Sequence, residues 1–172
     1  MGRVHSFSPL IDIQSQILIL GSLPGVESLR RQQYYAHPRN DFWRIIYTIN
    51  GESLNEEYFY GECFYGDYSC RCEFILSKKL ALWDICGSAE RIGSADGKIV
   101  DIEPNDIAGL LNVYPSIRRI ILNGRKAEKE YHRYFRELTI PAVYAPSTSP
   151  ALAALTFEEK LGAWRNALSL SN

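Results

Sequence analysis

Four short apolar runs constrain the fold of this chain more than any other feature of its sequence. They occupy residues 17–20, 80–85, 120–122 and 142–144. Each run ends near Gly, Asp, Asn or Pro, which is typical of buried strands that stop at a turn. The runs therefore predict four strands in the interior of the protein.

Helical patterns separate these runs. One helix face is predicted after the first run and another after the third, because apolar residues there recur at intervals of three and four. Their members are Phe42, Ile45, Ile46 and Ile49, and then Ala127, Tyr131, Tyr134 and Phe135. Strands that alternate with helices predict an α/β fold with a mostly parallel sheet and right-handed crossovers.

Two capping-box signatures mark helix starts. Thr156 and Glu159 form a T-x-x-E sequence at the start of an apolar stripe that continues to Leu168, and Ser53 and Glu56 repeat the pattern. The glycine-rich, polar segments 61–68 and 87–99 are predicted to be loops.

Size and composition fit one compact domain over residues 1–172, with 46% hydrophobic and 23% charged residues. These values exclude a disordered or membrane-embedded chain. Polar residues interrupt the N-terminal apolar positions, so neither a signal peptide nor a membrane span is predicted, and we expect a cytoplasmic protein. The four cysteines lack paired C-x-x-C spacing, which favours reduced thiols over a metal site.

Ligands of parallel sheets bind beyond the carboxyl ends of the strands. Four segments follow the predicted strands: GSLPG (21–25), 84–87, NGRK (123–126) and PSTSP (146–150). GSLPG is neither a Walker loop nor a dinucleotide fingerprint. Its backbone N–H groups could bind a carbonyl or an oxyanion, and a plain structural turn is the equal alternative.

GSLPG and the downstream YYAHPRNDFW (34–43) resemble motifs of the uracil-DNA glycosylase superfamily. The mismatch-specific uracil and thymine glycosylases have G-I-N-P-G in the first motif, whereas Leu23 stands here in place of their catalytic Asn. The chain is more similar to the hypoxanthine-DNA glycosylase branch, which has G-S-x-P-G. The resemblance continues through ALWD (81–84), NGRKA (123–127) and PSTSPA (146–151).

The resemblance implies a three-layer αβα sandwich around a four-stranded, mostly parallel sheet. It also implies that Asn40 is the catalytic residue of an enzyme that acts on a base flipped out of DNA. An amide does not accept a proton readily, but its oxygen can orient a water beside the sugar. Alternatively, Asn40 is the N-cap of the helix that begins near Phe42, and both roles are compatible.

The GSLPG turn is the predicted binding site for the leaving base, through Gly21, Ser22, Leu23 and Pro24. Its backbone N–H groups would act like an oxyanion hole, with Ser22 the main candidate.

Two further residues are assigned to the base. Tyr35 is expected to stack on it, or else to pack in the core beside Trp43. Asn123 is expected to bind the base edge or a phosphate, although an Asn-Gly turn explains it equally well.

Three titratable residues attract chemical roles that the resemblance does not give them. His37 is expected to shape the pocket wall and His132 to face solvent or phosphate, rather than to transfer protons. Asp84 could activate water or cap the next segment, and it is second to Asn40 as a catalytic candidate.

DNA contacts are expected from two segments. Ser147, Thr148 and Ser149 would approach phosphates, and Leu152 would be the wedge in the vacated stack or a hydrophobic staple. Arg125 and Lys126 are the expected basic contacts.

The net charge is −1, but acidic and basic residues are unevenly distributed along the chain. Residues 118–136 carry seven basic and two acidic side chains, and residues 28–50 carry four and one. These segments predict a modest basic face, or alternatively only solvated helices.

The resemblance thus implies a DNA glycosylase that excises hypoxanthine. It would be monofunctional, because no Lys lies in a matched catalytic motif to form a Schiff base. It would need no metal or diffusible cofactor and would act as a monomer on double-stranded DNA containing a damaged or deaminated base. The alternatives are a uracil or thymine mismatch glycosylase and a non-catalytic nucleic-acid-binding domain, which the loss of Asn at Leu23 keeps open.

Overall fold

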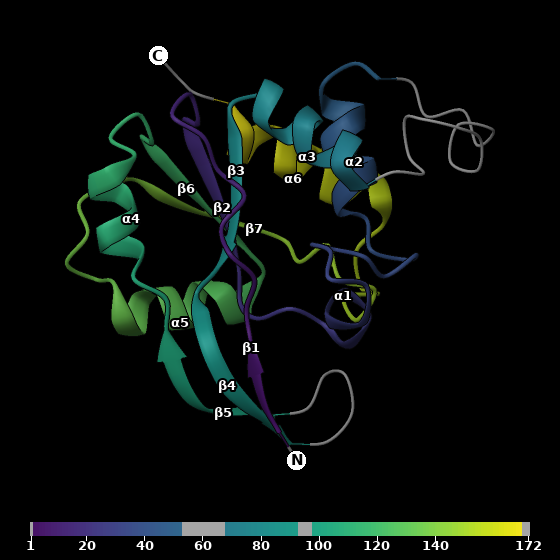
Figure 1. Cartoon of the computed structure of the whole chain (residues 1–172). Coiled ribbons are helices and arrows are strands. Elements are labelled where there is room, and N and C mark those ends of the chain that lie inside the picture. Colours follow the sequence, from purple (N-terminus) through teal and green to yellow (C-terminus); the bar gives the residue numbers. More distant parts are fainter. Residues whose placement is uncertain (1, 53–67, 93–97, 170–172) are drawn as a thin grey trace.

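The computed structural model describes residues 2–52, 68–92 and 98–169. A four-stranded parallel sheet runs through its centre in the order β3-β2-β6-β7 (Figure 1). The strands are β2 (Ile17–Gly21), β3 (Leu80–Asp84), β6 (Arg119–Asn123) and β7 (Ala142–Ala145). All four predicted strands are confirmed, with ends that differ by at most one residue.

Helices cover both faces of this sheet. Six are described: α1 (Val26–Arg31), α2 (Phe42–Ile49), α3 (Tyr68–Ser77), α4 (Ile107–Val113), α5 (Arg125–Tyr134) and α6 (Phe157–Leu168). In Figure 1, α2, α3 and α6 lie on one side of the sheet and α4 and α5 on the other. The predicted three-layer αβα sandwich is confirmed.

The alternation of side chains along β2 explains why both faces are covered. Ile17 and Ile19 join the core cluster beneath α2, α3 and α6, whereas Leu18 and Leu20 join the cluster beneath α4 and α5. Because both sets are buried, the strand is apolar at consecutive positions, which made it visible in the sequence.

A second sheet lies beside the first and corrects the prediction of a loop over residues 87–99. Strands β1 (Arg3–His5), β4 (Cys86–Ile92) and β5 (Lys98–Pro104) pair antiparallel in the order β1-β4-β5. The pairing joins segments far apart in the sequence, and polar residues alternate with Ala and Gly along β4. Local patterning therefore gave no strand signal.

The start of α6 follows the predicted capping box. The Thr156 side chain accepts from the N–H of Glu159, whose carboxylate accepts from the N–H of Thr156. The second predicted box, at Ser53 and Glu56, lies outside the described residues. Residues 61–67 of the first predicted loop also lie outside the described residues. Tyr68, the last residue of that predicted loop, is the first residue of α3.

Register places the ends of the central strands at one edge. Gly21 pairs with Asp84 and Asn123 with Ala145, so the segments that follow all four strands emerge together. Within the described residues, no helix has the combined length and apolar character that crossing a membrane needs.

Candidate active site

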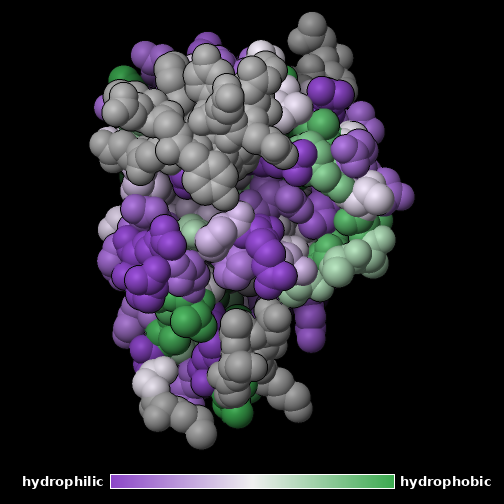
Figure 2. All heavy atoms as spheres, turned by 90° about the vertical axis from the view of Figure 1, so that its right-hand side faces the viewer, coloured by the Kyte–Doolittle hydropathy of each residue, from purple (hydrophilic) through white to green (hydrophobic). Residues whose placement is uncertain are grey.

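A cavity of about 840 Å³ opens at the carboxyl edge of the central sheet. The segment before α2, the GSLPG turn and the loop after β7 form its walls. Figure 2 views the side of the molecule that carries α1, where hydrophilic residues predominate and hydrophobic patches are separate. All but one of the predicted site residues line the cavity: Gly21, Ser22, Leu23, Pro24, Tyr35, Asn40, Asn123, Arg125, Lys126, Ser147, Thr148 and Ser149. The exception is Leu152.

Asn40 lies at the cavity wall directly before α2. Its Oδ1 accepts a hydrogen bond of 3.0 Å from the backbone N–H of Phe42. Asp41 is the N-cap residue by backbone position but makes no side-chain cap. The side chain of Asn40 therefore caps the helix as the alternative interpretation expected, but from the position before the N-cap residue. One lone pair of its amide oxygen remains for a water or substrate.

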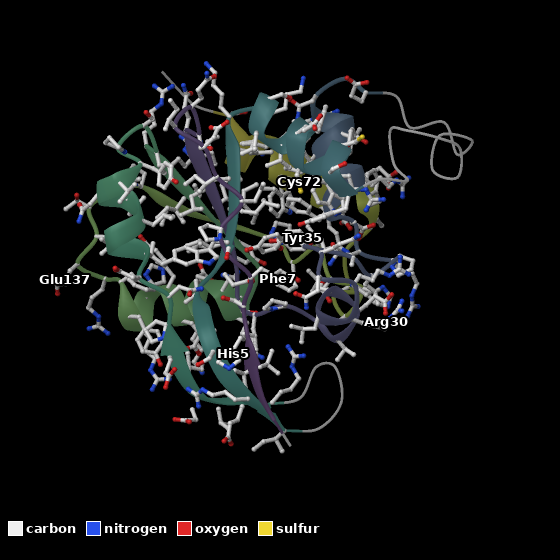
Figure 3. The ribbon with its side chains drawn as sticks, viewed as in Figure 1. His5, Phe7, Arg30, Tyr35, Cys72 and Glu137 are labelled. Carbon is white, nitrogen blue, oxygen red and sulfur yellow. The ribbon has the colours of Figure 1, made fainter. Side chains whose placement is uncertain are left out.

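Tyr35 stands between the cavity and the core. Its ring stacks on Phe42 with centroids 3.9 Å apart and planes at 23°, so Phe42 rather than Trp43 is its packing partner. The residue has a φ of 54°, a left-handed conformation that is uncommon for a bulky side chain and marks a constrained position. Figure 3 shows Tyr35 near the centre of the molecule, between α2 and α1.

Asn123 holds the loop after β7 in place. Its Oδ1 accepts from the N–H of Thr148 at 3.0 Å, and its Nδ2 donates to the Thr148 hydroxyl at 3.1 Å. Thr148 is 1% exposed, so its side chain is a structural part of the wall. The sequence did not reveal this pairing, because the two residues are 25 positions apart.

The same loop is tied to the start of α2. The carbonyl of Thr148 accepts from the N–H of Asp41 at 2.9 Å, and the Asp41 carboxylate pairs with Lys160 at 2.8 Å. Lys160 is 3% exposed and belongs to α6. Asn40 is thereby fixed relative to the loop by its neighbour Asp41.

The GSLPG turn lines the cavity, and two of its backbone N–H groups have no partner among the described residues. The carbonyls of Gly21 and Ser22 accept from Ile85 and Cys86, whereas the N–H groups of Ser22 and Leu23 have no acceptor among the described residues. The Leu23 side chain packs with Cys86 and a small apolar cluster of the second sheet. The residue that replaces Asn in the motif thus contributes packing.

Asp84 ends β3 at the same wall and is 5% exposed. Its Oδ2 has no hydrogen-bond partner among the described residues, so it does not cap the segment that follows. Burial raises the pKa of this carboxyl to about 7. Such a group is a candidate for function, since structural carboxylates are normally paired.

That the two histidines do not transfer protons stays a prediction. His37 lines the cavity, where its Nδ1 accepts from the N–H of Arg39. His132 is exposed on α5 outside the cavity lining.

Leu152 is half-buried beyond the cavity wall, and its proposed insertion into DNA stays a prediction.

The basic residues of segment 118–136 do not form one face, which corrects the expectation from charge counts. Arg125 and Lys126 line the cavity at the start of α5. Arg118 and Arg119 precede or begin β6 at the opposite edge, where they contact Gln16 and the C-terminal end of α6. Arg91 lines the cavity instead and donates to the carbonyl of Pro24 at 2.6 Å.

Comparison with known proteins decides the family. The Uracil DNA glycosylase superfamily matches residues 8–168. The chain belongs to this superfamily. A Methanosarcina acetivorans protein named hypoxanthine DNA glycosylase is 39% identical over 147 residues, covering 86% of this chain and 87% of that protein. A Methanosarcina barkeri protein of the same name is 39% identical over 136 residues, covering 79% and 80%.

A solved structure of the superfamily has the same architecture. The solution NMR structure of a Methanosarcina acetivorans protein assigned to the uracil DNA glycosylases superposes with a TM-score of 0.78 at 34% identity. The match covers 98% of this chain and 100% of the other. The resemblance drawn from the motifs is confirmed.

Membership of the superfamily does not itself assign roles to the cavity residues. Among the described residues, no three or more His, Cys, Asp or Glu side chains are grouped to hold a metal ion, and no disulfide joins Cys70, Cys72 or Cys86. Sequence reasoning missed Arg91, because it lies in a segment predicted as a loop within an acidic stretch. Its position depends on the antiparallel pairing of β4 with β5, in which Arg91 lies opposite Ile99.

Proposed function

We propose that this protein is a monofunctional DNA glycosylase that hydrolyses the N-glycosidic bond of a deaminated base in double-stranded DNA, with hypoxanthine the principal base. The observation that carries the proposal is the cavity, which brings Asn40, the GSLPG turn and the loop after β7 to one edge of the sheet. The two relatives named hypoxanthine DNA glycosylase support the choice of base.

Asn40 is the proposed catalytic residue. In the reaction, a water oxygen bonds to C1′ of the sugar while the C1′–N bond breaks and its electron pair leaves with the base. The free lone pair of the Asn40 oxygen would hold that water in line with the bond, a positioning role that suits an amide. No cofactor is invoked, and hydrolysis leaves an abasic site.

The leaving base would be held from two sides. Unpaired N–H groups of Ser22 and Leu23 would donate to it, and such donors contribute most when negative charge develops in the transition state. Gly21 and Pro24 shape this turn. The face of Tyr35 that is not stacked on Phe42 would pack on the base.

Contacts to the DNA backbone would surround the cavity. We propose phosphate contacts from Arg125, Lys126, Ser147 and Ser149, with the buried Thr148 holding the loop in shape. Asn123 also hydrogen-bonds the Tyr35 side chain, so we propose that it acts on the base or a phosphate by exchanging one of these contacts when DNA binds. Leu152 remains the proposed wedge. We further propose a single domain that acts as a cytoplasmic monomer.

A panel of duplexes tests the function. Labelled DNA carrying hypoxanthine, uracil, xanthine or a thymine mismatch is incubated with the protein and then treated with alkali to reveal abasic sites. We expect fastest release from the hypoxanthine duplex. Faster release of uracil would assign the protein to the uracil or mismatch enzymes, and absence of abasic sites on every duplex would leave only a binding domain.

A further inference from the structure

Asp84 combines features that a structural carboxylate does not have. It is 5% exposed, its Oδ2 has no hydrogen-bond partner, and no described residue forms an ion pair with it. A buried carboxylate without a donor or cation is costly, whereas the neutral acid is not charged and carries one O–H donor. The site therefore favours the protonated form.

The backbone around Asp84 places its carboxyl beside the expected position of the base. Gly21 pairs with Asp84 in the sheet, and a Cβ at Gly21 would lie 2.5 Å from Asp84 Oδ1 and 3.5 Å from the Tyr35 hydroxyl. Glycine thus leaves open the space that the carboxyl occupies. Gly21 is therefore close to both the Asp84 carboxyl and the Tyr35 hydroxyl, so the carboxyl lies near the two proposed base contacts, the GSLPG turn and Tyr35.

We propose that Asp84 binds the extruded base as a neutral carboxylic acid and donates a hydrogen bond to an acceptor atom of that base. The inference rests on the proposed function. As the C1′–N bond breaks, its electron pair passes to the base and the donated hydrogen bond strengthens. Water supplies both the oxygen that bonds to C1′ and the proton that ends on the departed base, so Asp84 keeps its own proton overall.

This donor would also distinguish the damaged base from its parent. Hypoxanthine carries an oxygen acceptor at the 6-position, where adenine carries an amino group that is itself a donor. A protonated carboxyl also has an acceptor oxygen, so the discrimination requires that the O–H faces the base; the adenine amino group then meets a donor, and buried unpaired groups strongly reduce the rate with the wrong base. Asp84 is thus a specificity-determining residue as well as a stabiliser of the leaving group.

Several titratable groups surround Asp84 at this wall. Burial raises the pKa of Tyr34, Tyr35 and Cys86, and a charge on Asp84 would raise each further, so all three stay neutral near pH 7. Burial likewise raises the pKa of Asp84. Other charged or titratable residues that line the cavity are Glu27, His37, Arg39, Arg91, Arg125 and Lys126, and none forms an ion pair with Asp84.

Two variants test the proposal. Asp84→Asn retains an N–H donor at every pH, whereas Asp84→Ala removes the donor. Single-turnover release of hypoxanthine is measured from about pH 5 to about pH 9, a range that spans titration of a raised carboxyl. Wild type is expected to lose about tenfold in rate per pH unit above the carboxyl pKa, while Asp84→Asn shows no such fall. Asp84→Ala is expected to be slower than wild type by about 100-fold or more at low pH.

A direct titration accompanies the kinetics. The Asp84 carboxyl carbon, identified in ¹³C NMR spectra by its absence from Asp84→Asn, is expected to titrate far above the other aspartates. A wild-type rate that rises with pH through this titration would overturn the proposal, because the carboxylate would then be the active form. Equal rates for folded Asp84→Asn and Asp84→Ala would overturn it too.

The outcomes separate this inference from the proposed function. Wild type that releases no base from any duplex contradicts the function and the inference together. Wild type that releases hypoxanthine with a flat or inverted pH profile contradicts the inference alone. Unchanged adenine rejection in an otherwise impaired Asp84→Ala would contradict the specificity role.

Discussion

The side-chain amide of Asn40 serves the helix and the cavity at once. Its oxygen accepts from the N–H of Phe42 while the residue lines the cavity wall. A carbonyl oxygen has two lone pairs, so capping does not exclude a water. The two roles make separate predictions, because capping affects stability and positioning of water affects rate.

Replacing Asn40 with Ala is expected to slow base release by about 100-fold or more, since the water is no longer oriented. Loss of the cap should cost about 1 kcal/mol in free energy of unfolding. Single-turnover rates and chemical denaturation measure the two effects. Asn40→Asp retains an oxygen for Phe42 and should keep wild-type stability. A folded Asn40→Ala that releases base at the wild-type rate would remove Asn40 from the mechanism.

Asp84 should also make stability depend on pH. Its folded pKa of about 7 exceeds the ordinary value of 3.8, so the folded protein holds this proton more tightly than the unfolded chain. Stability is therefore lost as pH rises from about 4 to about 7, because the buried group must ionise.

The Asp84→Asn variant lacks that loss. The difference in free energy of unfolding between Asp84→Asn and wild type should grow with pH in favour of the variant, and reach the order of 4 kcal/mol above pH of about 7. Urea denaturation of both proteins at about pH 5 and about pH 8 measures the gap, and comparison at one pH cancels other titrating groups. A gap that does not change with pH would contradict this expectation.

Three elements meet at the loop after β7 and hold it against the cavity. Asn123 at the end of β6 bonds Thr148, Asp41 before α2 bonds the Thr148 carbonyl, and Trp164 of α6 donates to the carbonyl of Pro146. The buried pair of Lys160 with Asp41 links α6 to α2 in addition. The loop is thus positioned by contacts from separate parts of the chain.

Gly124 allows β6 and α5 to approach this loop. It has a φ of 95°, and a Cβ there would lie 2.8 Å from the Cβ of Ser147. Gly124→Ala is expected to lower the free energy of unfolding by about 1–3 kcal/mol and to slow base release, because both the backbone and the loop must shift.

Gly162→Ala is the matched control. Gly162 lies within α6, and a Cβ there meets no atom within 4 Å. This substitution should stabilise the protein by roughly 0.5–1 kcal/mol without changing the rate. Denaturant titrations of both variants provide the measurement, and a Gly124→Ala protein as stable as wild type would show that the approach is not tight.

Basic side chains outnumber acidic ones around the cavity, although the molecule as a whole is nearly neutral. The net charge is −1, yet the cavity is lined by Arg39, Arg91, Arg125 and Lys126, and within the described parts of the chain its acidic lining residues are Glu27 and Asp84. Arg30 lies on the outer side of α1, away from Tyr35 (Figure 3), and pairs with Glu27. Such an arrangement suits modest, localised attraction of phosphates.

Arg125→Ala and Lys126→Ala are each expected to weaken DNA binding and to reduce the slope of log affinity against log salt by about one. Arg118→Ala is the control, because Arg118 is equally basic but lies at the opposite edge of the sheet beside Gln16. Fluorescence anisotropy with labelled duplex at several salt concentrations measures all three. Equal salt slopes for Arg118→Ala and Arg125→Ala would indicate a diffuse rather than a local contribution.

The sequence alone determined the central sheet, the helices of α2, α5 and α6, and most residues of the cavity wall. Buried parallel strands are apolar at consecutive positions, and amphipathic helices have apolar residues at every third or fourth position. Both patterns lie within a short stretch of sequence and can be recognised there. The motifs at the strand ends could be recognised as well, because each of them is a short continuous segment. Roles assigned within the wall, including that of Asn40, remain predictions.

Tertiary structure alone decided what depends on distant partners. The second sheet, the position of Arg91 and the bond between Asn123 and Thr148 join segments that no local pattern connects. Charge counts suggested one basic face, but the fold places basic residues of this segment at opposite edges of the central sheet. The isolation of Asp84 was likewise invisible, because whether a carboxyl is buried without a partner is set by the surroundings that the folded chain places around it.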